Sequence, residues 1–206
     1  MDVILLPCSG RKQEGGELDF RASDLSKILC RSTFDSLMAS RRELAILVGE
    51  RPGPDLGNPE IVNKIGFMPA YHRYSGTIYM KSNLEELYSG FEGRILIISA
   101  LYGLLDSNDL IRKYNLEMNR LMLPRYRLYA WWRTKRLGAI LAECLRFFHP
   151  ARIHDFLPIR YRKALDPLAS IATGLDVVRF EAGQGYSSDH RRAAEIKNIM
   201  SNKGSK

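Results

Sequence analysis

Four short apolar runs, separated by stretches with helical periodicity, constrain most strongly what this chain can fold into. The runs are DVILLP (2–7), RILIIS (94–99), RIHDFLP (152–158) and LDVVRFE (175–181). Short, nearly continuous apolar runs are typical of strands covered on both faces, as in parallel sheets. Because helical patterns alternate with these strands, the sequence predicts an α/β fold with a mostly parallel, or mixed, sheet flanked by helices.

The helical patterns fall between the apolar runs, and each has a recognisable start or break. We expect two helices within 22–48, with Ser32 or Thr33 as a cap, and a Gly- and Pro-rich break at 49–59. Further helices are predicted at 77–88, 125–148, 158–165 and 187–200, the last capped by Ser187 or Ser188. The length suits a single α/β domain over 1–200, followed by a frayed tail at 201–206.

Polar segments follow three of the predicted strands: Cys8–Lys12, Ser99–Gly103 and Pro158–Lys163. In parallel sheets, ligands bind in the crevice beyond the carboxyl ends of the strands. We therefore expect these segments to meet at one edge of the sheet and form a crevice. The expected lining is Ser9, Lys12, Tyr79, Tyr102, Asp109 and Glu117.

The segment PCSGRK (7–12) brings a thiol, a hydroxyl, a glycine and two cations together within six residues. Small residues let backbone N–H groups approach an anion, and Arg11 and Lys12 add positive charge. Nearby cations also favour the thiolate of Cys8 if the thiol is partly exposed, which makes it a candidate nucleophile. The alternative is a polar turn with one buried cysteine. The spacing of a P-loop is absent.

Three further segments offer candidate site residues, each with a structural alternative. PAYHRYSGTIY (69–79) is either a pocket wall that stacks a planar ring or an amphipathic connector. In SALYGLL and DLIRKYNLEM (99–118), Asp109, Tyr114 and Glu117 could face the crevice; alternatively Asp109 caps a short helix and Glu117 pairs with a local cation. In GQGYSSDH (183–190), a helix cap is favoured over a proton-transfer pair of Asp189 and His190.

Two sets of crevice candidates follow from these segments. The candidate catalytic residues are Cys8, Ser9, Lys12, Asp109 and Glu117. The candidate substrate- or nucleotide-binding residues are Arg11, Arg73, Gly76, Tyr79, Tyr102, Gly103 and Tyr114.

The net charge of +8 comes from one part of the chain. Residues 112–163 hold 13 Lys/Arg and three Asp/Glu, whereas residues 1–111 hold 12 and 15. Arginine interleaved with Tyr and Trp suits both phosphate pairing and base stacking, so this segment predicts a nucleic-acid surface; a merely solvated basic face is the alternative. The candidate phosphate contacts are Arg112, Lys113, Arg125, Arg127, Arg133, Arg160, Arg162 and Lys163.

Several classes of protein are disfavoured by the same sequence. The apolar runs are too short for a membrane helix, and the N-terminus lacks the basic start of a signal peptide, so we expect a cytoplasmic protein. The cysteines, Cys8, Cys30 and Cys144, are widely spaced and odd in number, which argues against a disulfide framework. No cluster has the spacing of a zinc or iron site, so we predict no metal and no cofactor.

The segment ISALYGLLDSNDLIRKYNLEM (98–118) resembles the signature of the YaaA peroxide-stress protein family, which carries a similar SGLYG…DL…Y.LEM stretch. The order of four weaker segments agrees with that family over roughly 6–180: LLPCSGRK, SGTIYMKS, LYAWW and DFLPIRYRKAL. The matched positions are Lys12, Gly76, Tyr79, Leu101, Tyr102, Gly103, Asp109, Tyr114, Glu117, Tyr161 and Lys163.

The resemblance implies an α/β fold around a basic cleft, binding of double-stranded DNA and a role under peroxide stress. Cys8 departs from the family's ISPAK form, and the family's helix-hairpin-helix DNA element has no clear counterpart beyond NKIGFMPA (63–70). PCSGRK is also similar to the PCS motif of archaeosine synthases, in which the cysteine is implicated in modifying a deazaguanine in tRNA.

Two functions follow from the sequence and stay open at this stage. The leading interpretation is a YaaA-like protein that binds nucleic acid, most plausibly DNA, and holds a base, a nucleotide or a flipped nucleotide in the crevice. The alternative is an enzyme for a nucleobase-like or phosphorylated small molecule, with Glu117 or Asp109 as general base and Cys8 as nucleophile.

Overall fold

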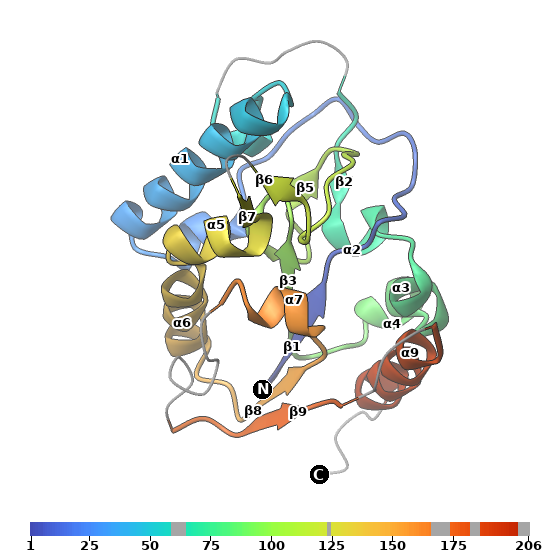
Figure 1. The fold of residues 1–206 in the computed structure, drawn as a ribbon. Helices are drawn as coiled ribbons and strands as arrows, with labels where there is room; N and C mark the ends of the chain where they lie inside the picture. Colours follow the sequence, from blue (N-terminus) through green and yellow to red (C-terminus); the bar gives the residue numbers. More distant parts are fainter. Residues whose placement is uncertain (59–64, 123–124, 166–173, 182–185, 202–206) are drawn as a thin grey trace.

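The computed structural model describes residues 1–58, 65–122, 125–165, 174–181 and 186–201, which are built around a five-stranded sheet (Figure 1). In spatial order its strands are β4 (Gly103–Asp106), β3 (Arg94–Ser99), β1 (Asp2–Pro7), β8 (Arg152–Asp155) and β9 (Val177–Arg179). β1 is parallel to both β3 and β8, β8 is parallel to β9, and β4 runs antiparallel to β3. The predicted α/β fold with a mixed, mostly parallel sheet is confirmed.

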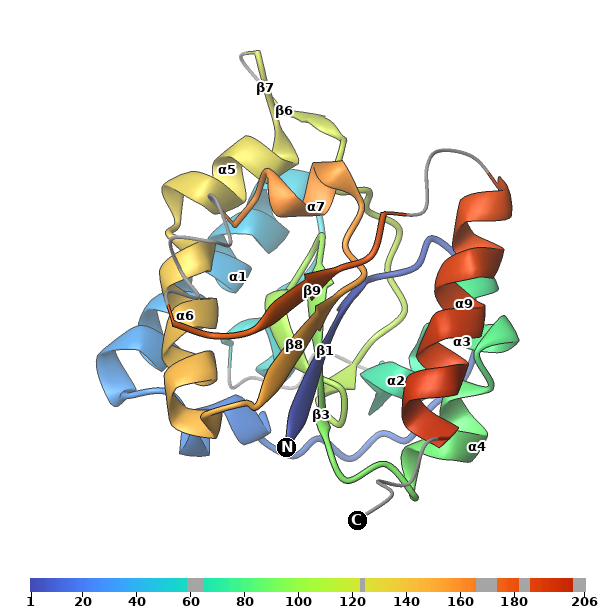
Figure 2. The same ribbon diagram turned by 90° about the horizontal axis from the view of Figure 1, so that it is seen from below.

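Helices cover both faces of this sheet. In chain order they are η1 (Asp24–Lys27), α1 (Arg31–Val48), η2 (Pro54–Leu56), α2 (Ala70–Arg73), α3 (Thr77–Lys81), α4 (Leu84–Tyr88), α5 (Leu128–Thr134), α6 (Leu137–Phe148), α7 (Ile159–Arg162) and α9 (Tyr186–Ser201). Figure 2 shows α1 and α6 on one side of the sheet and α3, α4 and α9 on the other. Two small antiparallel pairs complete the description: β2 (Met68–Pro69) with β5 (Leu110–Ile111), and β6 (Leu121–Met122) with β7 (Tyr126–Arg127).

The two central strands are apolar along their whole length because both of their faces are covered. Val3, Ile4, Leu5 and Leu6 of β1 are completely buried, and β3 is buried from Ile95 to Ser99. Burying one such branched side chain contributes about 1.5–3 kcal/mol relative to leaving it in water. These strands fix the centre of the sheet and therefore the place where their carboxyl ends meet.

The predicted bounds of β1 and β3 agree with the structure, while β8 and β9 are shorter than predicted. β4, an antiparallel edge strand that follows β3 through a tight turn, was not predicted from the sequence. Gly103 opens β4 with a φ of 71°, a conformation in which glycine carries little strain. A Cβ atom there would also lie 2.6 Å from the Trp132 ring, so the turn and the α5 indole occupy adjoining space.

Several predicted helices are interrupted or begin elsewhere. The helix predicted at 125–148 starts only after β7 and is split by Arg136, whose φ is 57°; the helix predicted at 77–88 is split by Asn83, whose φ is 54°. The cap of α1 is Cys30, so the prediction of Ser32 or Thr33 was wrong.

At the other end of the chain, Ser187 and Ser188 lie inside α9 and do not precede it, so the predicted cap was wrong here as well. Most of the predicted tail, 202–206, lies outside the described residues.

Candidate site at the carboxyl ends of β1 and β8

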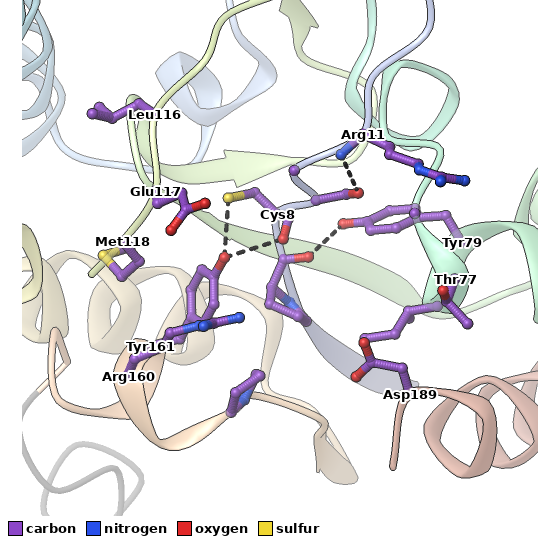
Figure 3. A pocket seen from close by; sticks show the side chains of 16 residues that line it. Cys8, Arg11, Thr77, Tyr79, Leu116, Glu117, Met118, Arg160, Tyr161 and Asp189 are labelled. Atoms are coloured by element: carbon purple, nitrogen blue, oxygen red, sulfur yellow. Dashed lines mark hydrogen bonds between the residues drawn. The ribbon is translucent and has the colours of Figure 1, made fainter. Parts of the chain in front are cut away.

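A cavity of about 310 Å³ lies beyond the carboxyl ends of β1 and β8. The chain leaves β1 to form β3 on one side and returns later to form β8 on the other, so the strand order reverses at this point. Such reversals are where open α/β sheets bind ligands. The lining residues are Pro7, Cys8, Ser9, Gly10, Arg11, Gly76, Thr77, Ile78, Tyr79, Leu116, Glu117, Met118, Pro158, Arg160, Tyr161 and Asp189 (Figure 3).

Cys8 lies at the inner wall of the cavity and is held in place by contacts from β3 and its following turn and from α7. Its backbone N–H donates to the carbonyl of Ile98 at 2.9 Å, and its sulfur accepts the N–H of Ala100 at 3.4 Å. The hydroxyl of Tyr161, from α7, lies 3.4 Å from the sulfur and donates to the Cys8 carbonyl at 3.1 Å. Burial first, and the neighbouring Cys8 second, raise the pKa of Tyr161, which keeps this phenol protonated.

Lys12 lies beside the cavity and does not line it. Its ammonium donates to the Ser9 carbonyl at 2.8 Å and stands 3.9 Å from the centre of the Tyr114 ring. Burial lowers the pKa of this ammonium, and the nearby Cys8 opposes that shift. Tyr114 itself is buried, and its hydroxyl lies 2.9 Å from both the Tyr74 and the Ser99 hydroxyls. The predicted Lys12 and Tyr114 therefore support the cavity from behind.

The loop after β1 and the start of α3 approach each other closely at the other wall. The Ser9 hydroxyl accepts the N–H of Arg11 at 3.1 Å, and a Cβ atom at Gly76 would collide with that hydroxyl. Tyr79 donates its hydroxyl to the Pro7 carbonyl at 2.8 Å, which fixes α3 against β1. The absence of a side chain at Gly76 thus lets the two walls approach each other closely.

The charged groups around the cavity are of both signs. Arg11, Arg160 and Glu117 are exposed, and Asp189 is half-buried. In Figure 3, Glu117 lies near the Cys8 thiol and Arg160 lies beside Tyr161, whereas Arg11, Thr77 and Asp189 lie toward the other side. Guanidinium and carboxylate groups beside aromatic rings can hold a planar ligand that both donates and accepts hydrogen bonds.

Asp109 does not face this cavity, which corrects the expected lining. One of its carboxylate oxygens accepts the N–H of Asp24 at the start of η1, and the other accepts the N–H of Asp106. Burial raises its pKa to about 6, with the Arg41 guanidinium opposing the shift. The alternative interpretation, in which Asp109 caps a short helix, matches these contacts.

Arg73 is another candidate that the structure places elsewhere. It is completely buried and donates to the carbonyls of Gln13, Gly15, Gly66 and Ile111. A single guanidinium therefore joins three backbone segments through four carbonyls, which explains why a cation is tolerated there without a carboxylate.

Tyr102 and Gly103 belong to the turn between β3 and β4 and are completely buried. The Tyr102 hydroxyl donates to Asp55 at 2.5 Å, and Asp55 in turn accepts from Arg112 at 2.5 and 2.8 Å. On the other side of the turn, the Trp132 indole donates to the Ala100 carbonyl at 2.8 Å. The SALYG segment is therefore a packing unit, and its predicted binding residues Tyr102 and Gly103 contact protein groups, among them the Trp132 ring.

The predicted phosphate contacts divide into paired and unpaired cations. Arg112 is buried against Asp55, Arg162 pairs with Asp155 at 2.8 Å, and Lys113 pairs with Glu14. A second group is exposed and forms no ion pair among the described residues; we call it the basic rim. It consists of the predicted Arg125 and Arg127 at the β6–β7 hairpin, Arg133 on α5, and Arg160 and Lys163 at α7, together with Arg120 at the hairpin, which was not predicted as a phosphate contact.

Thr77 and Met118 also line the cavity but were not predicted from the sequence, and Asp189 was not predicted to lie there. The position of Tyr161 could be inferred from the sequence, because its segment follows β8 and the carboxyl end of β8 adjoins that of β1. Among the described residues, no three His, Cys, Asp or Glu side chains come together as a metal site. Within the same residues, no helix is long and apolar enough to cross a membrane.

Fold and site together define an α/β protein with a ligand-sized cavity at the reversal point of its sheet. The model of one protein family, described as peroxide stress protein YaaA, matches residues 30–190. The chain therefore belongs to the YaaA family, as the LYG…LEM segment indicated. The match begins after β1, so the PCSGRK loop lies outside it.

Two curated relatives agree with this assignment. A UPF0246 protein of Rhizorhabdus wittichii is 39% identical over 83 residues, which cover 37% of this chain and 33% of the relative. A UPF0246 protein of Ruegeria sp. (strain TM1040) is 36% identical over 96 residues, which cover 46% and 38%. The chain therefore matches only about a third of the length of the first relative and 38% of the second.

Proposed function

We propose that this YaaA-family protein is a cytoplasmic DNA-binding protein of the peroxide stress response, and that its cavity receives a base or nucleotide of the bound DNA. The observation that carries the proposal is the basic rim. Its cations come from the β6–β7 hairpin, α5 and α7, and α7 also supplies Arg160 and Tyr161 to the cavity. Cations that form no ion pair among the described residues are available for phosphates, and each one that neutralises a phosphate releases counterions.

The cavity adds a reason to choose nucleic acid over another polyanion. A volume of about 310 Å³ is small for a ligand site but adequate for one planar ring system. Tyr79 and Tyr161 offer ring surfaces, while Glu117 and Arg11 offer an acceptor and a donor for a base edge.

Fluorescence anisotropy with labelled duplex, bubble and single-stranded DNA, at about 50 and about 200 mM salt, tests the proposal. We expect sub-micromolar duplex binding that weakens steeply with salt. The double variant Arg125→Glu/Arg127→Glu should lower the affinity by about tenfold or more and reduce the salt slope by about two. The control Lys27→Glu/Arg31→Glu makes the same change in net charge at two exposed residues away from the rim. Equal losses in both variants, or no binding at the lower salt, would refute a specific role of the rim.

A second function is favoured by one observation, the position of the Cys8 thiol in the cavity wall. The sulfur accepts the Ala100 N–H, which can stabilise a developing thiolate, and lies 3.4 Å from the Tyr161 hydroxyl. In this alternative the protein is an enzyme for a nucleobase-like or phosphorylated small molecule, with Cys8 as nucleophile and Glu117 as general base.

The two functions can be distinguished by the salt dependence of ligand binding and by substitution of Cys8. An enzyme should bind its small ligand with little salt dependence and should lose turnover in Cys8→Ala, whereas DNA binding should tolerate that change. Cys30→Ser is the matched control, because Cys30 is exposed at the start of α1 and does not line the cavity.

A further inference from the structure

The β6–β7 hairpin projects from the body at the edge where the parallel strands end (Figure 2). Leu121 pairs with Arg127, and Met122 pairs with Tyr126. Three hydrogen bonds hold its base: the Leu128 N–H to the Arg120 carbonyl at 2.9 Å, the Tyr129 N–H to the Met118 carbonyl at 3.1 Å, and the Arg127 guanidinium to the Asn119 carbonyl at 3.0 Å. The hairpin is therefore anchored to the start of α5 and to the wall of the cavity.

This hairpin presents apolar side chains to solvent between cations. Leu121 is 60% exposed and Tyr126 is 37% exposed, and they alternate with Arg120, Arg125 and Arg127 of the basic rim. Exposed apolar side chains flanked by cations suit a partner that is both apolar and anionic. The flanking arginines make that partner a polyanion, and the polyanion that also offers apolar surfaces is stacked DNA.

The hairpin is also close to the cavity along the chain. Met118 lines the cavity, and Leu121 follows three residues later, so their Cα atoms are at most roughly 10 Å apart. A side chain inserted between two base pairs by this hairpin would act next to a space that can receive the displaced base. Proteins that insert apolar side chains into duplexes unstack base steps in this way.

We propose that the β6–β7 hairpin is an unstacking wedge, in which Leu121 enters the base stack of duplex DNA while the arginines beside it contact the phosphates. The displaced base then moves toward the cavity formed by the loop after β1 and by α7. This inference rests on the proposed DNA binding and adds the element that opens the duplex.

A duplex with a central 2-aminopurine tests the wedge, because this base fluoresces more strongly when it is unstacked. We expect wild-type protein to raise the fluorescence roughly threefold or more. Leu121→Ser should remove most of that rise and change the anisotropy-measured affinity by less than about threefold, since the phosphate contacts are retained. Leu121→Phe should retain the rise, and circular dichroism checks that each variant is folded.

Ile46→Ser is the matched control, because Ile46 is a similarly exposed apolar residue (66%) on α1. If the wild-type protein binds the duplex without any rise in fluorescence, the wedge is refuted and DNA binding stands. If Leu121→Ser and Ile46→Ser behave alike, Leu121 is not the wedge. If no duplex binds at all, the proposed function fails together with this inference.

Discussion

The arginines of this molecule occupy two different environments: some are buried and hydrogen-bonded in the interior, and others are exposed on the surface. Arg41, Arg73 and Arg112 are at most 4% exposed, and their guanidinium groups are bonded inside the protein. Arg125 and Arg127, on the β6–β7 hairpin, are exposed and form no ion pair among the described residues. Arg112 and Arg125 nevertheless belong to the same basic stretch of sequence. The comparison teaches that local charge density does not distinguish a binding cation from a structural one.

The physical difference is the cost of desolvation. A buried guanidinium must recover its lost hydration through hydrogen bonds, so it is found where carbonyls or a carboxylate converge. Arg41 donates to the carbonyls of Tyr102 and Leu104 at 2.9 and 2.6 Å, which secures the SALYG turn. An exposed guanidinium keeps its hydration and can exchange it for phosphate. Substitutions in the two regions should therefore affect different measurements.

The largest effect is expected from Asp55→Ala. This change leaves the Arg112 guanidinium buried without its carboxylate and removes the acceptor of the Tyr102 hydroxyl. We expect a loss of about 3–5 kcal/mol in the free energy of unfolding, measured with urea.

The double variant Asp55→Leu/Arg112→Met should recover most of that stability, because it removes both charges together. A double variant as unstable as Asp55→Ala would show that the packing of the native pair, and not the unpaired charge, controls the loss.

Gly103→Ala should have the next largest effect and tests whether SALYG is a packing unit. The added methyl group would meet the Trp132 ring at 2.6 Å, and the φ of 71° disfavours any residue with a side chain. We expect about 2–4 kcal/mol of destabilisation in urea. Gly49→Ala is the control, since its φ of 79° carries the same backbone strain without a nearby atom. Equal losses in both variants would assign the whole effect to the backbone.

Asp109 should give a pH-dependent stability that Asp109→Asn lacks. Its pKa of about 6 in the folded protein lies above the ordinary value of 3.8, so the folded state binds the proton more tightly than the unfolded state. Stability should therefore rise as pH falls through 6 toward 4, by about 2–3 kcal/mol. Urea unfolding of both proteins between these pH values isolates the contribution of Asp109. If the free energy of unfolding of the two proteins changed with pH in the same way, Asp109 would not be the group responsible.

The centre of the fold could be predicted from the sequence because β1 and β3 are short apolar runs covered on both faces. The β4 edge strand could not, since it depends on a turn at Gly103 whose geometry is set by Trp132, about thirty residues away. Similarly, Arg136 and Asn83 adopt positive φ values that interrupt otherwise regular helical patterns.

The cavity was predictable in part for a related reason. The rule that parallel strands end at one edge brings Cys8, Ser9 and Arg160 together, and the structure places them there. The same reasoning failed for Asp109 and Arg73, because a polar residue near a strand end can instead bond to the backbone of a distant loop. That choice is made by the tertiary structure, which local sequence does not encode.

The smallest effect on stability, and the sharpest test of the comparison, is expected at Arg133. Arg133→Gln removes one exposed rim cation, so the urea midpoint should not change measurably, while the salt slope of DNA binding should fall by about one. Arg112→Gln should lower the urea midpoint, because it leaves the Asp55 carboxylate without its cation in the interior. It should leave the salt slope unchanged, because it removes no cation from the surface. Urea unfolding and anisotropy on the two variants measure both quantities. If Arg112→Gln lowered the salt slope in a protein that stayed folded, the buried cation would contribute to DNA binding, and the division between the two regions would be wrong.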